Sequence, residues 1–171
     1  MQRVEVTYFD KTSDSDPERI TEETLRLAKR RADELAITQF VIASSTGLVA
    51  KKALDLLADK TLVLIGETRE WYEKGFPKEL ESKGVRMIFS HEVKYNYAND
   101  VQAAFRRLSE GAKVCPEIVM IAADRELIPI GKEVVAIAGT GSGADTSMVI
   151  VSAKSKNFRE LKIRELICKP R

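Results

Sequence analysis

Few residues in this sequence are suited to disulfides, metal binding or acid–base catalysis. Its two cysteines, Cys115 and Cys168, lie far apart and form no Cys-x-x-Cys pair, so we expect no disulfide scaffold and a reducing, cytoplasmic location. His91 is the only histidine, and we therefore expect no metal site. No serine, histidine and acidic residue form a recognisable catalytic triad. The sequence shows no evident catalytic machinery of its own.

Long apolar runs and an excess of one charge sign are also lacking. The first ten residues, MQRVEVTYFD, contain no apolar segment of the signal-peptide type, and no run approaches the roughly 20 residues of a membrane helix. The 28 Lys and Arg residues against 26 Asp and Glu leave a net charge of only +2, which is too small to indicate a nucleic-acid or membrane surface. We expect the partner to be a small molecule, with neither nucleic acid nor membrane involved.

The composition is that of a globular domain, with 171 residues, 44% of them hydrophobic and 32% charged. Several apolar runs are continuous rather than alternating, which is typical of parallel strands covered on both faces. Because these runs alternate with helical patterns, the sequence predicts one α/β domain over residues 1–171, a three-layer sandwich around a mostly parallel mixed sheet. The last third lacks intervening helices and is expected to be antiparallel or mixed.

Capping and turn residues indicate where the elements begin and end. A polar loop is expected up to Asp16 and Pro17, which suit the N-cap and first position of a helix. Helices are also expected after Gly47, over 76–84, and over 100–111 with Leu108 facing inward. Strands are predicted over 4–9, 40–43, 61–66, 85–90, 117–124 and 161–168, with two more around a glycine-rich loop within 133–153.

Three hydroxyl residues and a glycine lie where a buried strand meets a helix: Ser44, Ser45, Thr46 and Gly47. The first turn of a helix has free N–H groups and the positive end of the helix dipole, and glycine lets an anion approach the backbone. These features together suit a phosphate. The alternative is that Ser45 or Thr46 is a plain N-cap, and the motif alone favours neither reading.

A second loop alternates glycines with hydroxyl residues: Gly139, Thr140, Gly141, Ser142 and Gly143. It is neither a GxGxxG motif followed by a helix nor a P-loop, since no Gly-Lys-Ser/Thr is present. Glycine-rich backbone can still form an anion-binding nest. The alternative is a flexible turn, but a turn rarely requires three glycines, and we favour a ligand-binding role.

Other candidates are weaker. Gly66, Glu67 and Thr68 follow a predicted strand and could border the same cleft or cap the next helix, and Lys51 could add positive charge or be simply exposed. Trp71 is more often a core residue than a stacking wall. The remaining isolated candidates, with no partner evident from the sequence, are His91, Glu117, Asp124 and Asp145.

Two segments resemble the C-terminal domain of pyruvate kinase. They are ITEETLRLAKRRADEL followed by FVIASSTGLVAKKA, and IPIGKEVVAIAGTGSG. A further match, carried by GAKVCPEIVMIAAD, EVVAIAGTGSGADT and ELICKPR, covers almost the whole chain and identifies it as a member of the small, stand-alone, mostly archaeal family called pyruvate kinase alpha/beta domain-like. The catalytic barrel of pyruvate kinase has no counterpart in a chain of this length, so the resemblance implies no kinase activity.

The resemblance implies a ligand, because the stand-alone family is associated with flavin mononucleotide (FMN). Residues 44–47 would hold its phosphate, residues 139–143 would approach the ribityl chain or phosphate, and residues 66–68 would border the ring. The alternative is a non-catalytic sensor of a phosphorylated metabolite such as a sugar phosphate, and a homo-oligomer is possible. The chain departs from the family pattern at KTSDSDPERIT, at ADRELIP and after His91, which affects the expected ring pocket rather than the two loops.

Overall fold

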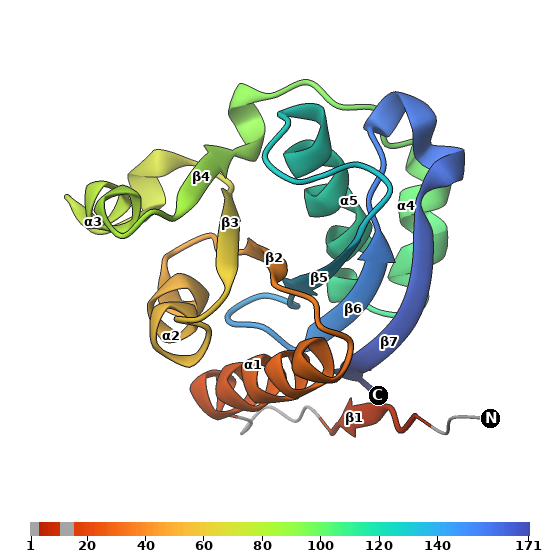
Figure 1. Ribbon diagram of the computed structural model, residues 1–171, viewed down its shortest axis with the longest axis horizontal. Coiled ribbons are helices and arrows are strands. Elements are labelled where there is room, and N and C mark those ends of the chain that lie inside the picture. Colours follow the sequence, from red (N-terminus) through yellow and green to blue (C-terminus); the bar gives the residue numbers. More distant parts are fainter. Residues whose placement is uncertain (1–3, 11–15) are drawn as a thin grey trace.

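The computed structural model describes residues 4–10 and 16–171. In this part of the chain seven strands form one mixed sheet in the order β1-β7-β6-β5-β2-β3-β4 (Figure 1). The pairs β1–β7, β5–β2, β2–β3 and β3–β4 are parallel, and β5–β6 and β6–β7 are antiparallel. The mostly parallel α/β sheet and the antiparallel C-terminal third are confirmed.

The elements follow one another in the chain as βα units and then a β meander. They are β1 (Thr7–Phe9), α1 (Pro17–Glu34), β2 (Gln39–Ala43), α2 (Leu48–Leu56), β3 (Thr61–Gly66), η1 (Arg69–Trp71), α3 (Phe76–Ser82), β4 (Arg86–Phe89), η2 (Ser90–Glu92), α4 (Asn99–Arg106), α5 (Glu110–Asp124), β5 (Glu133–Ala138), β6 (Thr146–Val151), η3 (Ser155–Glu160) and β7 (Lys162–Pro170), where η is a 3-10 helix.

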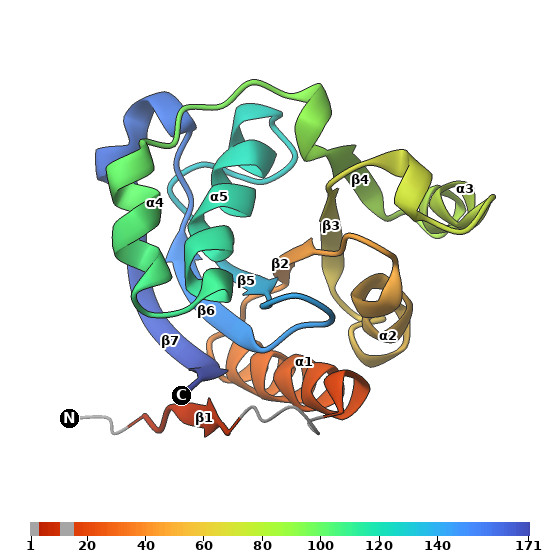
Figure 2. The ribbon, with the colours of Figure 1, turned by 180° about the vertical axis from the view of Figure 1, so that it is seen from behind.

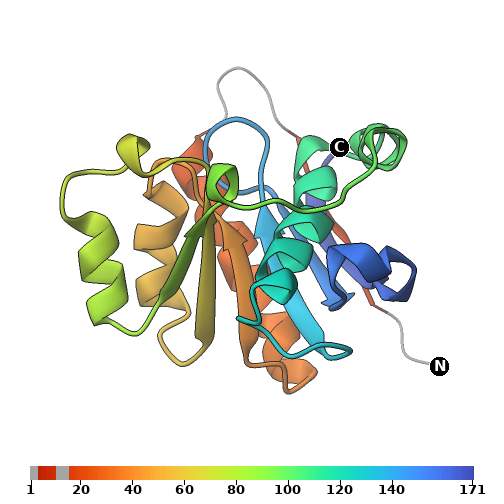
Figure 3. The ribbon, with the colours of Figure 1, turned by 90° about the horizontal axis from the view of Figure 1, so that it is seen from above.

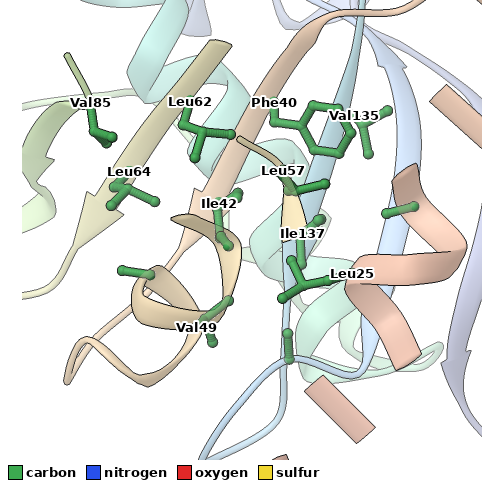
Figure 4. Close-up of a cluster of buried hydrophobic side chains, with 14 of the residues drawn as sticks. Leu25, Phe40, Ile42, Val49, Leu57, Leu62, Leu64, Val85, Val135 and Ile137 are labelled. Carbon is green, nitrogen blue, oxygen red and sulfur yellow. The ribbon is translucent and has the colours of Figure 1, made fainter. Parts of the chain in front are cut away.

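Helices cover both faces of the sheet (Figures 2 and 3). Successive residues of a strand point to opposite faces. Phe40 and Ile42 of β2 therefore join the core beneath α1, α2 and α3, and Val41 between them joins the core beneath α5. Figure 4 shows the first of these cores, in which side chains of β2, β3 and β5 meet Leu25 of α1 and Val49 of α2. This arrangement is the three-layer sandwich expected from the continuous apolar strands.

Helix α1 begins where its capping residues predicted. The Asp16 carboxylate accepts a hydrogen bond from the Glu18 N–H at 2.9 Å, and Pro17 occupies the first turn. Most of the polar loop expected before Asp16 falls on residues 11–15, outside the described residues. At the N-terminal edge of the sheet, β1 covers only the last part of the strand expected over 4–9.

The strand predicted over 117–124 is wrong, because these residues form the C-terminal half of helix α5. The run IVMIAA within it is continuously apolar because α5 is buried between the sheet and α4. Periodicity cannot distinguish such a helix from a buried strand. Ser109 caps the helix by accepting from the Ala112 N–H at 2.9 Å. Gly111, predicted to end a helix, instead lies in the first turn of this one.

Two further findings concern α4 and the cysteines. Helix α4 ends at Arg106, and Leu108 beyond it is 49% exposed, so the expected inward orientation of Leu108 is wrong. Cys168 and Cys115 are free thiols in the cores on opposite faces of the sheet. Over the described ranges, 4–10 and 16–171, none of the helices has the length and apolar character needed to cross a bilayer.

Candidate functional site

Two predicted loops come together at the carboxyl ends of neighbouring parallel strands. Strand β2 ends at Ala43 and β5 at Ala138, and the two strands pair from Phe40 with Val135 to Ile42 with Ile137. The chain leaves β2 into α2 on one face of the sheet, whereas it reaches β5 from α5 on the other (Figure 1). Ligands of open α/β sheets bind at such a switch point.

A cavity of about 360 Å³, here called the cradle hollow, lies at this point. Its size is within the range of small-molecule sites. The two loops contribute most of its wall, and the rest comes from the end of β2, the start of α2, Glu67 after β3, η1 and α5. The lining residues are Ala43, Ser44, Ser45, Thr46, Leu48, Val49, Glu67, Trp71, Val114, Gly139, Gly141, Ser142 and Gly143.

The sequence left open whether the hydroxyl residues of the first loop cap α2 or bind a phosphate, and the structure separates these two roles. Ser44 is buried, and its Oγ accepts from the Ala50 N–H at 3.3 Å, so Ser44 is the side chain that caps α2. Ser45 and Thr46 are exposed and make no side-chain hydrogen bond to the described part of the chain. The plain N-cap reading of Ser45 or Thr46 is therefore wrong, and both hydroxyls are available to a ligand.

The backbone at the start of α2 is suited to an anion. Gly47 adopts the left-handed conformation, with φ of 97°, and a Cβ there would also lie 3.1 Å from the Phe76 ring. This conformation turns the chain directly into the helix. The N–H groups of Leu48 and Val49, in the first turn, have no intrahelical acceptor. Both residues line the cradle hollow, and the positive end of the helix dipole lies at this end of α2.

The glycine-rich loop is held in place rather than flexible. The buried Asp145 carboxylate accepts from the Thr140 N–H at 3.0 Å and from the Thr146 hydroxyl at 2.7 Å. From α1, the Thr21 hydroxyl accepts from the Ala144 N–H at 2.9 Å, and the Thr24 hydroxyl donates to the Ala144 carbonyl at 3.2 Å. The geometry of the loop is thus set by side chains outside it, and Asp145 is a positioning residue rather than an isolated acid.

Two of the glycines in this loop are required by their surroundings. A Cβ on Gly139 would overlap the carbonyl oxygen of Gly143. Gly143 itself has φ of 81°, and a Cβ there would lie 2.5 Å from the Thr21 hydroxyl oxygen. Gly141 also has positive φ, of 72°, but open space around it. The loop thus approaches the hollow with bare backbone and little side-chain bulk.

The cradle hollow contains no basic side chain among its lining residues. Lys51 points away from it and pairs with Glu73 at 2.9 Å, beside a different surface depression. The one charged residue in the lining is Glu67. An anion in this hollow would be held by backbone N–H groups, hydroxyls and the helix dipole.

A second cavity of about 410 Å³, here called the side hollow, adjoins the first and shares Ala43, Ser45, Glu67 and Val114 with it. Gly66 and Glu67, predicted to border a ring, line this hollow, whereas Thr68 lies outside both and donates to Glu70. Its remaining lining residues are Ile65, Ser90, Tyr95, Glu110, Lys113, Ile118, Glu117 and Ile121.

A buried charged cluster in the side hollow was missed by the sequence reasoning. Lys113 Nζ lies 2.6 Å from Glu117 Oε2, and the Tyr95 hydroxyl donates to Oε1 of the same carboxylate. Burial, and then the neighbouring Glu117 carboxylate, raise the pKa of Tyr95 above its ordinary value. The signal was the i,i+4 spacing of Lys113 and Glu117, which pairs side chains only on a helix. The incorrect strand over 117–124 concealed it.

The other candidates have defined places. Trp71 is 51% exposed and lines the cradle hollow, so the core position that we expected for it is wrong. His91 Nδ1 lies 2.6 Å from the Glu67 carbonyl oxygen and holds the end of β3. Asp124 Oδ1 accepts from the Ser155 N–H at 2.9 Å, a structural role. Among the residues described, no three His, Cys, Asp or Glu side chains are grouped where they could hold a metal ion.

Comparison with known structures defines the fold class. No protein-family model matches the chain. A pyruvate kinase from Cryptosporidium parvum is similar, with a TM-score of 0.51 and 13% identity over 83% of this chain. Pyruvate kinase of the same organism in complex with ADP gives a TM-score of 0.47 and 13% identity over 92% of this chain. The chain spans about a quarter of those proteins, 24% and 25% respectively.

The similarity establishes the fold alone. The protein has an α/β fold like that of part of a pyruvate kinase chain, in agreement with the fold expected from the two sequence segments. Its site is a cleft at the carboxyl ends of parallel strands, with a backbone cradle at one end and a charged, apolar-floored hollow at the other.

Proposed function

We propose that the protein binds flavin mononucleotide in the cleft formed by the two hollows, as a stand-alone relative of the pyruvate kinase C-terminal domain without kinase activity. One observation carries the proposal: the phosphate-type cradle adjoins a second hollow of suitable size for a ring, and the two hollows share Ser45 and Glu67 in their walls. Membership of the mostly archaeal stand-alone family and association into a homo-oligomer are parts of the same proposal.

The phosphate would lie in the cradle hollow. The free N–H groups of Leu48 and Val49, with the hydroxyls of Ser45 and Thr46, would donate to its oxygens from α2. The backbone of Gly141 and Ser142 would approach from the other side. Within residues 4–10 and 16–171, the groups that would hold the phosphate are backbone N–H groups and hydroxyls rather than basic side chains.

The ring would lie in the side hollow. Ile65, Ile118 and Ile121 line this hollow and provide apolar surface for a flat ring system. Gly66 also lines it, and glycine is required there because a Cβ would lie 2.8 Å from the Phe89 ring in the core on the other face of the sheet. The flavin, when bound, would supply any redox chemistry, and the protein would supply binding and orientation.

The test is the absorbance of the purified protein between the near-ultraviolet and blue, followed by titration of the colourless protein with FMN and with riboflavin. We expect FMN to bind more tightly than riboflavin, since only FMN fills the cradle. Thr46→Asp places a carboxylate in the cradle without the strain of changing Gly47, and it should reduce this preference. Thr61→Asp, at the opposite end of the sheet, is the matched control. Failure of the wild-type protein to bind FMN would refute the proposal.

A second candidate function is a non-catalytic sensor of a sugar phosphate. It is favoured by the cradle hollow itself, which the exposed Trp71 lines together with Ser45 and Ser142, because a tryptophan ring offers a large apolar face with a polar N–H. A thermal-shift series would separate the two functions, since stabilisation follows ligand concentration over Kd. Stabilisation by sugar phosphates and none by FMN would select the sensor.

A further inference from the structure

The charged cluster of the side hollow has hydrogen-bonding capacity that residues 4–10 and 16–171 do not use. Lys113 and Glu117 are each only 9% exposed, and both line the hollow with Tyr95. A lysine ammonium has three N–H donors and a carboxylate about four acceptor positions. Their mutual contact at 2.6 Å occupies one of each, and Tyr95 occupies one further acceptor position.

The neighbouring groups leave this capacity free. Glu110 Oε1 is 3.9 Å from Lys113 Nζ, too far for a hydrogen bond, and its other oxygen accepts from Arg106 at 2.9 Å. Tyr95 has a single O–H, which it donates to Glu117, so its role is to position the carboxylate. A donor on Lys113 and an acceptor on Glu117 therefore stand side by side at the wall of the hollow.

We propose that Lys113 and Glu117 bind a ring edge on which a carbonyl stands beside an N–H, as in the pyrimidinedione part of a flavin. Lys113 donates to the ligand carbonyl and Glu117 accepts from the ligand N–H. The inference rests on the proposed function for the identity of the ring, and it assigns which end of the ring enters the side hollow. Buried polar groups of this kind discriminate strongly against a ligand that leaves them unpaired.

A purely structural role for the cluster makes a different prediction. The segment around Tyr95 is also tied to α5 by the Tyr97 hydroxyl, which donates to the Lys113 carbonyl at 3.1 Å. If the ion pair only joined that segment to α5, its removal would alter stability and leave ligand selectivity unchanged. The decisive measurement is therefore selectivity for the N–H of the ring.

The experiment compares the binding of FMN and of N3-methyl-FMN, which lacks the N–H, by fluorescence titration. The wild-type protein should prefer FMN by about tenfold or more, since an unpaired buried polar group has a cost of that order. In Lys113→Met/Glu117→Met the ratio should fall to about one. This double replacement removes both charges, keeps the net charge and the approximate side-chain volume, and is of a kind that buried ion pairs often tolerate. The control is Glu79→Met/Lys83→Met. It removes an exposed ion pair, in which Lys83 Nζ lies 2.9 Å from Glu79 Oε1, and neither residue lines either hollow.

Uridine 5′-monophosphate carries the same ring edge and a phosphate, and it separates the two proposals. If FMN binds and the N3-methyl ratio is unchanged in the double variant, the assignment of Lys113 and Glu117 is overturned while the flavin function stands. If FMN does not bind but uridine 5′-monophosphate binds and requires the pair, the flavin function is overturned and the assignment stands. If neither nucleotide binds the wild-type protein, both are overturned.

Discussion

The two hollows of the cleft are built from different parts of the chain. The cradle hollow is formed mainly by the start of α2 and the glycines of the β5–β6 loop, and none of the described residues that line it is basic. The side hollow is formed by side chains of α5, with the buried pair Lys113 and Glu117 above an isoleucine floor. A backbone site depends on chain conformation, and a side-chain site depends on which residues share a helix face.

This difference predicts how each hollow responds to substitution. Changes in the cradle act through backbone strain and capping, whereas changes in the side hollow act through unpaired charge. The following changes test this contrast in order of decreasing expected effect.

The largest effect is expected for Glu117→Ala in the side hollow. It leaves the Lys113 ammonium buried without its partner, and breaking a buried pair in this way costs about 3–5 kcal/mol of unfolding free energy. Lys113→Met/Glu117→Met removes both charges and should lie within about 1 kcal/mol of the wild-type protein. Urea denaturation measures both, and equal losses in the two variants would contradict the charge-based account.

In the cradle, Gly139→Ala is expected to cost about 2–3 kcal/mol, because the new Cβ overlaps the Gly143 carbonyl and the loop must shift. Gly141→Ala is the matched control. Its φ is also positive but its surroundings are open, so the expected cost is about 1 kcal/mol. Chemical denaturation again gives the comparison. Similar losses of unfolding free energy in the two variants would show that the close approach of Gly139 to the Gly143 carbonyl does not determine the cost.

Ser44 and Ser45 separate capping from ligand binding within one loop. Ser44→Ala removes the oxygen that accepts from the Ala50 N–H and should lower stability by about 1 kcal/mol. Ser45→Ala should leave the melting temperature unchanged and weaken FMN binding by a few-fold, because it removes one hydrogen bond to the phosphate. Measurements of thermal unfolding and of FMN titration on both variants are needed. A stability loss in Ser45→Ala would contradict the division of roles.

The smallest effect concerns an ion pair outside both hollows. Hydrogen bonds from Arg31 lower the pKa of Glu165 below 4.5 despite its partial burial. A carboxyl with a depressed pKa in the folded state stabilises the protein fully above its unfolded value and loses this contribution as the pH falls through the folded pKa. The free energy of unfolding should therefore decline below about pH 4.5, and Glu165→Gln should flatten that decline. An identical pH profile in the variant would contradict the coupling. The effect is modest because Arg31 keeps Glu34 at 2.6 Å.

The sequence predicted the backbone-built part of the molecule well. Continuous apolar runs identified β2, β3 and β5, and the hydroxyl and glycine motifs after two of them marked the wall of the cradle hollow. These features depend on local conformation, which glycine, proline and capping residues encode directly. Asp16 and Pro17 at the start of α1 are a further example.

The side-chain-built part was not predictable in the same way. Helix α5 is buried on all sides, so its apolar run carries no helical period, and with the wrong secondary structure Lys113 and Glu117 do not face one another. Tyr95 reaches the pair from a segment of the chain 22 residues earlier than Glu117. Likewise, Thr21 and Thr24 anchor the glycine-rich loop at Ala144, which lies 123 and 120 residues further along the chain. Such contacts depend on the tertiary fold.

The exposed position of Trp71 gives the protein an intrinsic optical reporter. Because it is the only tryptophan and it lines the cradle hollow, almost all indole emission from the protein originates at one wall of the cleft. A ligand that enters the cradle alters the polarity around that indole, and a chromophore in the adjoining hollow accepts its excitation energy. Occupancy of the cleft can therefore be followed in the unlabelled wild-type chain, without a dye or an engineered probe.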